Sequence, residues 1–226
     1  MRHYNEPVPA GGEYTNIKYM ISAENVLFIL FVVFFFGCAW YYYKDEFELK
    51  CIVAGENGNT YCVRDRKNSK EYAELLDEAT QRMKKLVEHM NNKFPENPAV
   101  KRLVAGFNPE KINETLPNST LVAYTENKSK MSFCLTEKKN GTKIIDINTL
   151  MFVAIHELSH ISSKSIGHKT EFWDNFKFLL KNATEIGIYT PVDYKKENRE
   201  YCDMKIKDNP MYDYKSGGRG GEASKH

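Results

Sequence analysis

The sequence has almost no excess of charge of either sign: 32 lysines and arginines stand against 30 aspartates and glutamates, a formal net charge of +2 over 226 residues. The basic residues are interspersed, and no predicted strand combines basic and aromatic side chains as nucleic-acid platforms do. The chain also lacks any C-x-x-C spacing. We therefore expect no nucleic acid as a partner and no zinc knuckle built from cysteines.

One segment lacks charge altogether. Residues 26–43 read VLFILFVVFFFGCAWYYY, between Glu24 and Lys44. As a helix this segment rises about 27 Å, just enough to cross a bilayer core of roughly 30 Å, and Trp40 with the tyrosines after it forms an aromatic belt. A buried helix of a soluble core would show a polar face, and this segment has none. We therefore predict a single-pass anchor in a lipid bilayer.

A cleaved signal peptide is the alternative, because Gly37 and Ala39 have the small-residue spacing of a cleavage site. The N-terminal tail, residues 1–25, is long and weakly charged, which favours a retained anchor. The orientation is not indicated, because basic residues both precede and follow the span. These are Arg2 and Lys18 before it, and Lys44 and Lys50 after it.

Four of the five cysteines follow the predicted span, an even number that can form disulfides. Cys51 and Cys62 flank two short segments around the four-residue turn 55–58, so a hairpin would place them opposite each other. We pair these two, and by elimination Cys134 with Cys202. Unpaired thiols in a cytosolic protein are the alternative interpretation.

Five N-x-S/T sequons also follow the span, and such a number of sequons is typical of glycoproteins. They lie at Asn113, Asn118, Asn127, Asn140 and Asn182. Together with the cysteines they predict that the C-terminal part is lumenal, extracellular or in an oxidising virion environment.

The strongest motif is His156-Glu157-Leu158-Ser159-His160, an HExxH sequence. The hydrophobic spacing from about Asn148 to Ser163 predicts a helix, so the two histidines project from one face with a carboxylate beside them. Downstream, Gly167 can bend the chain and bring His168 back as a third ligand. The sequence thus predicts one Zn²⁺ per chain, held by the three histidines.

Either Glu171 or Glu185 could be the third ligand instead of His168, as an acid is in many HExxH peptidases. In either case Glu157 is the predicted general base, which takes a proton from the attacking water and passes it to the departing amine. One of Tyr189, Tyr194 or Tyr201 could stabilise the oxyanion, although ordinary packing is the better interpretation for each.

The HExxH motif, a short spacer and Gly167-His168-Lys169-Thr170-Glu171-Phe172-Trp173 together resemble the HExxH…GHxxxFW arrangement of SprT-like and WLM-type (minigluzincin-like) zinc metallopeptidases. The resemblance covers residues 156–173 as a motif and roughly 68–190 as an order of elements. It implies that His168 completes the metal site and that an edge strand holds a peptide or protein substrate in extended form. SprT-like proteins are typically soluble and act near DNA, so that role is not implied for a chain with a membrane segment.

The C-terminal stretch through Tyr201-Cys202 is also similar to membrane-anchored metallopeptidase-like proteins of large DNA viruses. The patterns predict an α+β fold: a compact zincin-like domain at 47–209 behind the anchor, then a flexible tail at 210–226. Two short strands around the turn 55–58, which carry Cys51 and Cys62, precede the first helix. A long helix is expected from Asn68, capped with Glu71, to Lys93, with an apolar stripe of Tyr72, Leu75, Leu76, Ala79, Met83, Leu86, Val87 and Met90 along one face. It is followed by a short helix, 100–105, and a loop, 108–118. The remaining expected elements are an antiparallel sheet of 120–125, 131–135 and 143–147; the HExxH helix, capped by Asn148; and a packing helix from Thr170 to Gly187.

Two functions fit these predictions. The first is a membrane-anchored zinc peptidase with His156, His160 and His168 on the metal and Glu157 as base. The second is a membrane or virion structural protein that keeps the metallopeptidase fold without turnover. Glu157 favours the first, because an inactive scaffold has no use for that carboxylate. The sequence does not indicate an oligomeric state.

Overall fold

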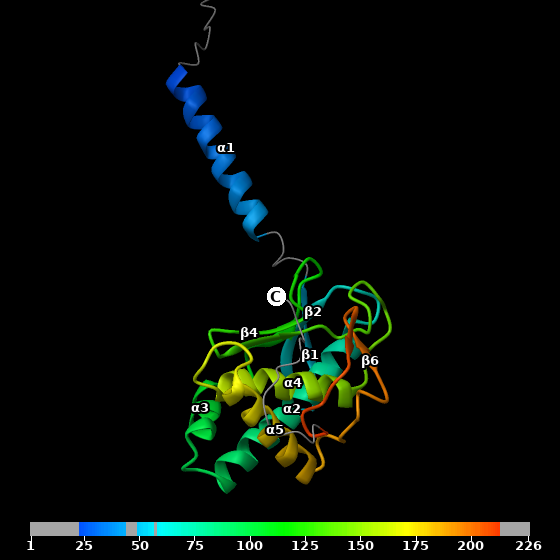
Figure 1. Cartoon of the computed structure of the whole chain (residues 1–226). Coiled ribbons are helices and arrows are strands. Elements are labelled where there is room, and N and C mark those ends of the chain that lie inside the picture. Colours follow the sequence, from blue (N-terminus) through cyan, green and yellow to red (C-terminus); the bar gives the residue numbers. More distant parts are fainter. Residues whose placement is uncertain (1–22, 44–48, 57, 213–226) are drawn as a thin grey trace, which may run out of the picture. The chain divides into compact units, whose positions relative to one another are not determined.

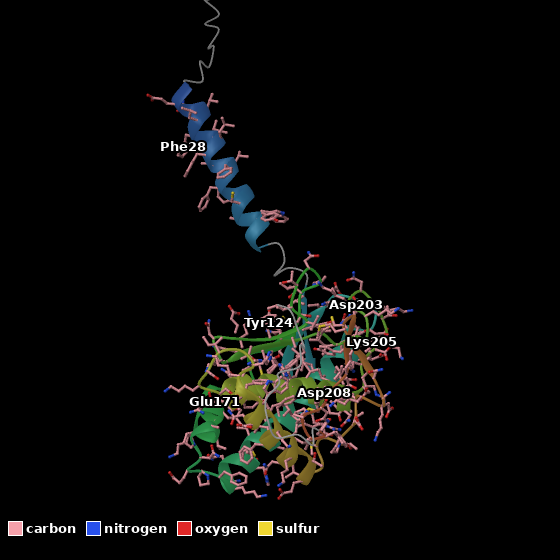
Figure 2. The ribbon with its side chains drawn as sticks, in the orientation of Figure 1. Phe28, Tyr124, Glu171, Asp203, Lys205 and Asp208 are labelled. Atoms are coloured by element: carbon pink, nitrogen blue, oxygen red, sulfur yellow. A yellow bond between two sulfur atoms is a disulfide. The ribbon has the colours of Figure 1, made fainter. Side chains whose placement is uncertain are left out.

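The computed structural model describes residues 23–43, 49–56 and 58–212, and the chain divides into two units, Met1–Tyr43 and Lys44–His226. In the first unit, α1 (Ala23–Tyr43) includes all of the predicted span. Most of its side chains are exposed, as Phe28 is in Figure 2. A helix of 21 residues rises about 32 Å. The helix α1 is therefore long and apolar enough to cross a membrane, as a signal sequence or as an anchor.

The second unit is a mixed α+β fold, as predicted (Figure 1). Its helices are α2 (Ser69–Lys93), α3 (Pro98–Gly106), α4 (Ile147–Ser162) and α5 (Thr170–Glu185). Its strands are β1 (Leu49–Ala54), β2 (Asn59–Arg64), β3 (Ile112–Glu114), β4 (Ala123–Glu126), β5 (Lys130–Phe133), β6 (Arg199–Tyr201) and β7 (Met204–Ile206). Of the predicted tails 1–25 and 210–226, residues 1–22 and 213–226 lie outside the described residues. Residues 23–25 belong to α1, and Met211 packs against the core.

The predicted N-terminal hairpin is present, and it is joined by the predicted disulfide. Strands β1 and β2 pair antiparallel with Cys51 opposite Cys62, and these two cysteines are bonded, with their Cα atoms 3.9 Å apart. Asn57 of the predicted turn lies outside the described residues. Gly55 has φ +72°, and a Cβ there would collide with the Asp77 carboxylate of α2, so this glycine lets the turn pack closely against the helix.

The second disulfide, Cys134–Cys202, is also confirmed, with Cα atoms 6.1 Å apart. It joins the residue after β5 to the turn between β6 and β7. These two strands form a hairpin that the sequence patterns do not predict. The backbone amide of Cys202 also donates to Thr136 O at 3.0 Å. The C-terminal hairpin is therefore fastened to the sheet by a covalent bond and by the backbone.

Removing the second disulfide should destabilise the protein more than removing the first. Cys134–Cys202 spans 68 residues and Cys51–Cys62 spans 11, so the chain-entropy model gives about 4 and about 3 kcal/mol respectively. We expect Cys134→Ser/Cys202→Ser to lower the midpoint of urea unfolding further than Cys51→Ser/Cys62→Ser does. The reverse order would show that strain or unfolded-state structure outweighs loop entropy.

The central sheet differs from the prediction. Its order is β3-β5-β4, with β4 and β5 antiparallel as expected but β3 parallel to β5 and located inside the predicted loop 108–118. The predicted strand 143–147 is wrong: Ile144 forms only an isolated bridge with Thr136. The reason is that Asp146 already caps the next helix, so the chain must turn there.

Two predicted helix caps are also wrong, and a third is correct in position only. Asp146, rather than Asn148, caps α4, because its side chain accepts from Thr149 N at 2.9 Å. Asn148 instead exchanges two hydrogen bonds with the backbone of Thr190. At α2, Asn68 is the N-cap residue as predicted, although its side chain makes no cap bond. At α5, Thr170 is the first helical residue rather than the cap. The short helix begins at Pro98, behind an Asn97 cap.

Helix α4 lies at the centre of the domain. It contacts α2, α3, α5 and β4, and most of its length is buried. Its neighbour α2 contributes the predicted apolar stripe, of which Leu75 alone is only half-buried. Figure 1 shows α4 directly beneath β4. The HExxH motif therefore lies on the helix that contacts most of the other helices of the domain, and this helix is next to the edge strand β4.

Candidate metal centre

Three histidine rings meet on one face of α4. His156 and His160 are one helical turn apart with ring centroids at 5.0 Å, and His168 lies 4.9 Å from each. The candidate ligand nitrogens of all three lie within 4.8 Å of one another, and the Nε2 atoms of His156 and His168 are 3.0 Å apart. The structure thus brings together the three residues that the sequence predicts as metal ligands.

The donor set fits a zinc ion. Zinc takes imidazole nitrogens at roughly 2.0–2.1 Å in a tetrahedral array, which places the nitrogens a little over 3 Å apart. The Nε2 atoms of His156 and His168, 3.0 Å apart, are within a few tenths of an ångström of that spacing. All three imidazoles are partly exposed, so an ion and a further small ligand can reach them.

The loop between α4 and α5 holds His168 in place. Gly167 has φ +75°, the left-handed backbone expected for the predicted bend. The Trp173 indole donates from Nε1 to His168 O at 3.1 Å. The Glu171 carboxylate accepts from the backbone amides of Lys164 and Ser165 at 2.9 and 3.0 Å, which ties the start of the loop to the start of α5.

The two alternative third ligands are engaged elsewhere. Hydrogen bonds from the Lys164 and Ser165 amides, helped by the Arg102 guanidinium, lower the pKa of Glu171 to about 2. Glu185 lies at the end of α5 and pairs with Lys93, at 2.7 Å from its Oε2. Neither carboxylate belongs to the histidine cluster. In this structure His168, and not an acid, completes the group.

Phe172 forms the wall behind the histidines. Its ring centroid lies 4.8, 4.4 and 4.6 Å from those of His156, His160 and His168. Its side chain is fully buried, and Phe176 contacts the far side of His156 at 5.3 Å. The aromatic pair of the GHxxxFW motif therefore has two tasks: Phe172 limits the rotamers of the imidazoles, and Trp173 fixes the loop.

Glu157 is buried beside the cluster, with 5% of its surface exposed. Its Oε2 accepts a hydrogen bond of 2.8 Å from Thr125 Oγ1 on β4. Burial raises the pKa of Glu157 to about 7, and the Thr125 hydrogen bond opposes that rise only in part. A carboxyl with this pKa can both accept and donate a proton near neutral pH.

This pKa predicts a pH-dependent stability. The native state holds the Glu157 proton more tightly than the unfolded chain, so the free energy of unfolding falls as pH rises from about 4.5 to about 7. In chelator-treated protein, Glu157→Gln should remove that loss and be more stable than wild type at pH 8, by at most roughly 3 kcal/mol. The two proteins should converge at pH 4.5. Urea unfolding at both pH values checks this, and an equal difference at both would contradict it.

The three tyrosines considered as oxyanion donors are engaged in packing and in hydrogen bonds within the fold. Tyr201 OH donates to Val122 O and accepts from Cys134 N, each at 3.1 Å. Tyr189 OH accepts from Asn209 Nδ2 at 3.0 Å, and the rings of Tyr189 and Tyr194 both pack on Phe152. Their geometry supports the packing interpretation. No sequence pattern points to Thr125, because a single threonine in a strand has no distinctive spacing.

Comparison with known proteins identifies viral relatives. The chain is 27% identical to uncharacterized protein R325 of Acanthamoeba polyphaga mimivirus over 192 residues, 83% of this chain and 94% of the relative. A shorter match is to uncharacterized protein 136R of Invertebrate iridescent virus 6, which is 35% identical over 35% of this chain and 44% of the relative. A similar match joins it to uncharacterized protein 042R of Invertebrate iridescent virus 3, 37% identical over 36% of this chain and half of the relative.

No family model and no solved structure matches the chain. The relatives are uncharacterized proteins, so the resemblance to SprT-like metallopeptidases stays a prediction. The comparisons do agree with the expected similarity to viral proteins: the chain has relatives in viruses from two groups, and one of them aligns over most of both chains.

Proposed function

We propose that this protein is a membrane-anchored zinc peptidase in which His156, His160 and His168 hold the metal and Glu157 is the general base. One observation carries the proposal: three imidazoles converge beside a buried carboxylate whose hydrogen-bond partner, Thr125, lies on the strand next to them. The order of the elements, with a long helix, a small sheet, the HExxH helix and a packing helix, supports a zincin-like fold.

Bound zinc would supply a Lewis acid that lowers the pKa of water and polarises a carbonyl group. The chain's own residues then move the proton. Thr125 donates to Oε2 of Glu157 and leaves Oε1 to accept a proton from the attacking water. The same carboxyl can then pass that proton to the departing amine.

Strand β4 is the best candidate for the substrate strand. It is an edge of the β3-β5-β4 sheet, and it contacts α4 through Thr125 and Glu157. Val122 O bonds Cys134 N across the ladder, so by alternation the backbone groups of Ala123 and Thr125 point away from β5. An extended peptide could add to that edge with its scissile bond near the histidines.

A stability argument favours catalysis over a purely structural role. Burying Glu157 without a cationic partner raises its pKa and costs folding energy at neutral pH. A scaffold protein would gain from a neutral residue at this position, whereas an enzyme needs the carboxylate. Proteins commonly accept such a cost at active sites.

The direct test is cleavage of an unfolded protein, such as reduced and alkylated casein, by the full chain purified in detergent. We expect cleavage that a chelator abolishes and that stoichiometric Zn²⁺ restores. Metal binding without cleavage of any unfolded substrate would instead support the structural protein of a membrane or virion.

A further inference from the structure

The five glycosylation sequons differ sharply in accessibility. Asn118, Asn127 and Asn140 have exposed side chains, and Asn113 is half-buried inside β3. Asn182, on α5, is only 3% exposed. The expectation that all five sequons suit a glycoprotein is therefore wrong for Asn182, because an N-linked glycan is bulky and must lie at the surface.

The surroundings of Asn182 leave no path for a glycan. Its Nδ2, the atom to which a glycan would be attached, donates to Phe178 O at 2.9 Å. Its Oδ1 lies 3.4 Å from Nε2 of His89 on α2, the helix against which α5 packs. A sugar at this buried nitrogen would need space between the two helices and would force α5 away from α2. Helix α5 also carries Phe172, the wall of the histidine cluster, so the site would be lost as well.

Because N-glycans are attached before a domain folds, the burial of Asn182 indicates on which side of the membrane the domain lies. N-glycans are transferred to the unfolded chain as each sequon enters the lumen of the endoplasmic reticulum, before burial can protect it. Asn182-Ala183-Thr184 has threonine in the third position and no proline, so it is an acceptor sequence while the chain is unfolded. A domain that entered this lumen would therefore be modified at Asn182 before it could fold.

We propose that the C-terminal domain lies on the membrane face that the N-glycosylation machinery does not reach, with the N-terminal tail on the lumenal side. The domain then folds without glycans. This inference rests on the proposed insertion of α1 and is independent of the peptidase activity.

The two disulfides agree with this placement only if they form outside that lumen. Each forms by transfer of two electrons and two protons from a thiol pair to an acceptor, which on this face would belong to the class of protein thiol oxidases. Both disulfides require an oxidising environment, so the proposal places the domain in one other than the lumen that attaches N-glycans, such as the interior of a virion.

The chain offers a matched reporter for the test. Pro7→Thr converts Asn5-Glu6-Pro7 into a sequon in the N-terminal tail, on the other side of α1. The full wild-type chain and the P7T variant are expressed in cultured eukaryotic cells. Membrane insertion is measured by alkaline carbonate extraction, and glycans by the mobility shift on treatment with an N-glycosidase. We expect no shift for wild type and a shift of one glycan for P7T.

A glycan on any of the five native sequons of the inserted wild-type chain would overturn the proposal. So would an inserted P7T chain that carries no glycan, because the tail would then not be lumenal. If carbonate extracts the chain, the insertion of α1 has failed and the proposed orientation fails with it. Cleavage of casein by the same preparation is scored separately, so failure of the proposed activity is distinguished from failure of the orientation.

Discussion

Replacing Glu157 by glutamine should abolish peptide cleavage and leave metal content unchanged. Glutamine keeps the size of the side chain and can still accept the hydrogen bond from Thr125, but it cannot take a proton from water. A general base contributes typically 10²–10⁴-fold to a rate, so we expect a loss of at least about 100-fold. The histidines are untouched, so zinc should bind as in wild type.

The matched control is Glu88→Gln, which makes the same exchange at an exposed position on α2. It should leave both cleavage and zinc content at wild-type values. Unchanged cleavage by the Glu157 variant would refute the proposed base. Loss of zinc from that variant would show that Glu157 supports the metal site rather than the proton transfer.

Replacing His168 by alanine should remove the metal. The histidine cluster would lose one of its three ligand nitrogens, while α4 would keep the other two. Changes in the outer shell of metal sites already cost 10–100-fold in affinity, so the loss of a ligand should cost at least about 100-fold. Competition with a zinc-binding dye measures this affinity directly.

The same titration decides between the candidate third ligands. Glu185→Gln should bind zinc like wild type, because Glu185 pairs with Lys93 away from the cluster. Glu171→Gln should bind more weakly than wild type but better than His168→Ala, because it loosens the loop without removing a ligand. If His168→Ala retained tight zinc while either glutamine variant lost it, an acid would be the true ligand.

The sequence predicted those parts of the fold that depend on local patterns. Helical periodicity predicts the apolar stripe on α2, and an uncharged run predicts α1. The register of a hairpin predicts the pairing of Cys51 with Cys62. Short segments display such patterns by themselves. The convergence of His156, His160 and His168 was also predictable, because helical spacing fixes the first two and Gly167 permits the bend to the third.

The rest depended on contacts between distant residues. Strand β3 has only three residues, too few for a periodic signal, and its parallel pairing with β5 is set by packing. The bond between Thr125 and Glu157 joins residues 32 positions apart. The burial of Asn182 could not be predicted from the sequence either, because a sequon is defined by three residues whether or not the fold covers it.

The proposed function requires that the three histidines hold a metal ion, and the most direct measurement of this is the metal content of the full chain. The protein would be purified in detergent, dialysed exhaustively and measured by elemental mass spectrometry beside His168→Ala. Our account predicts about one zinc per wild-type chain and almost none in the variant. A folded wild-type chain that retains no metal and binds none on titration with Zn²⁺ would contradict it.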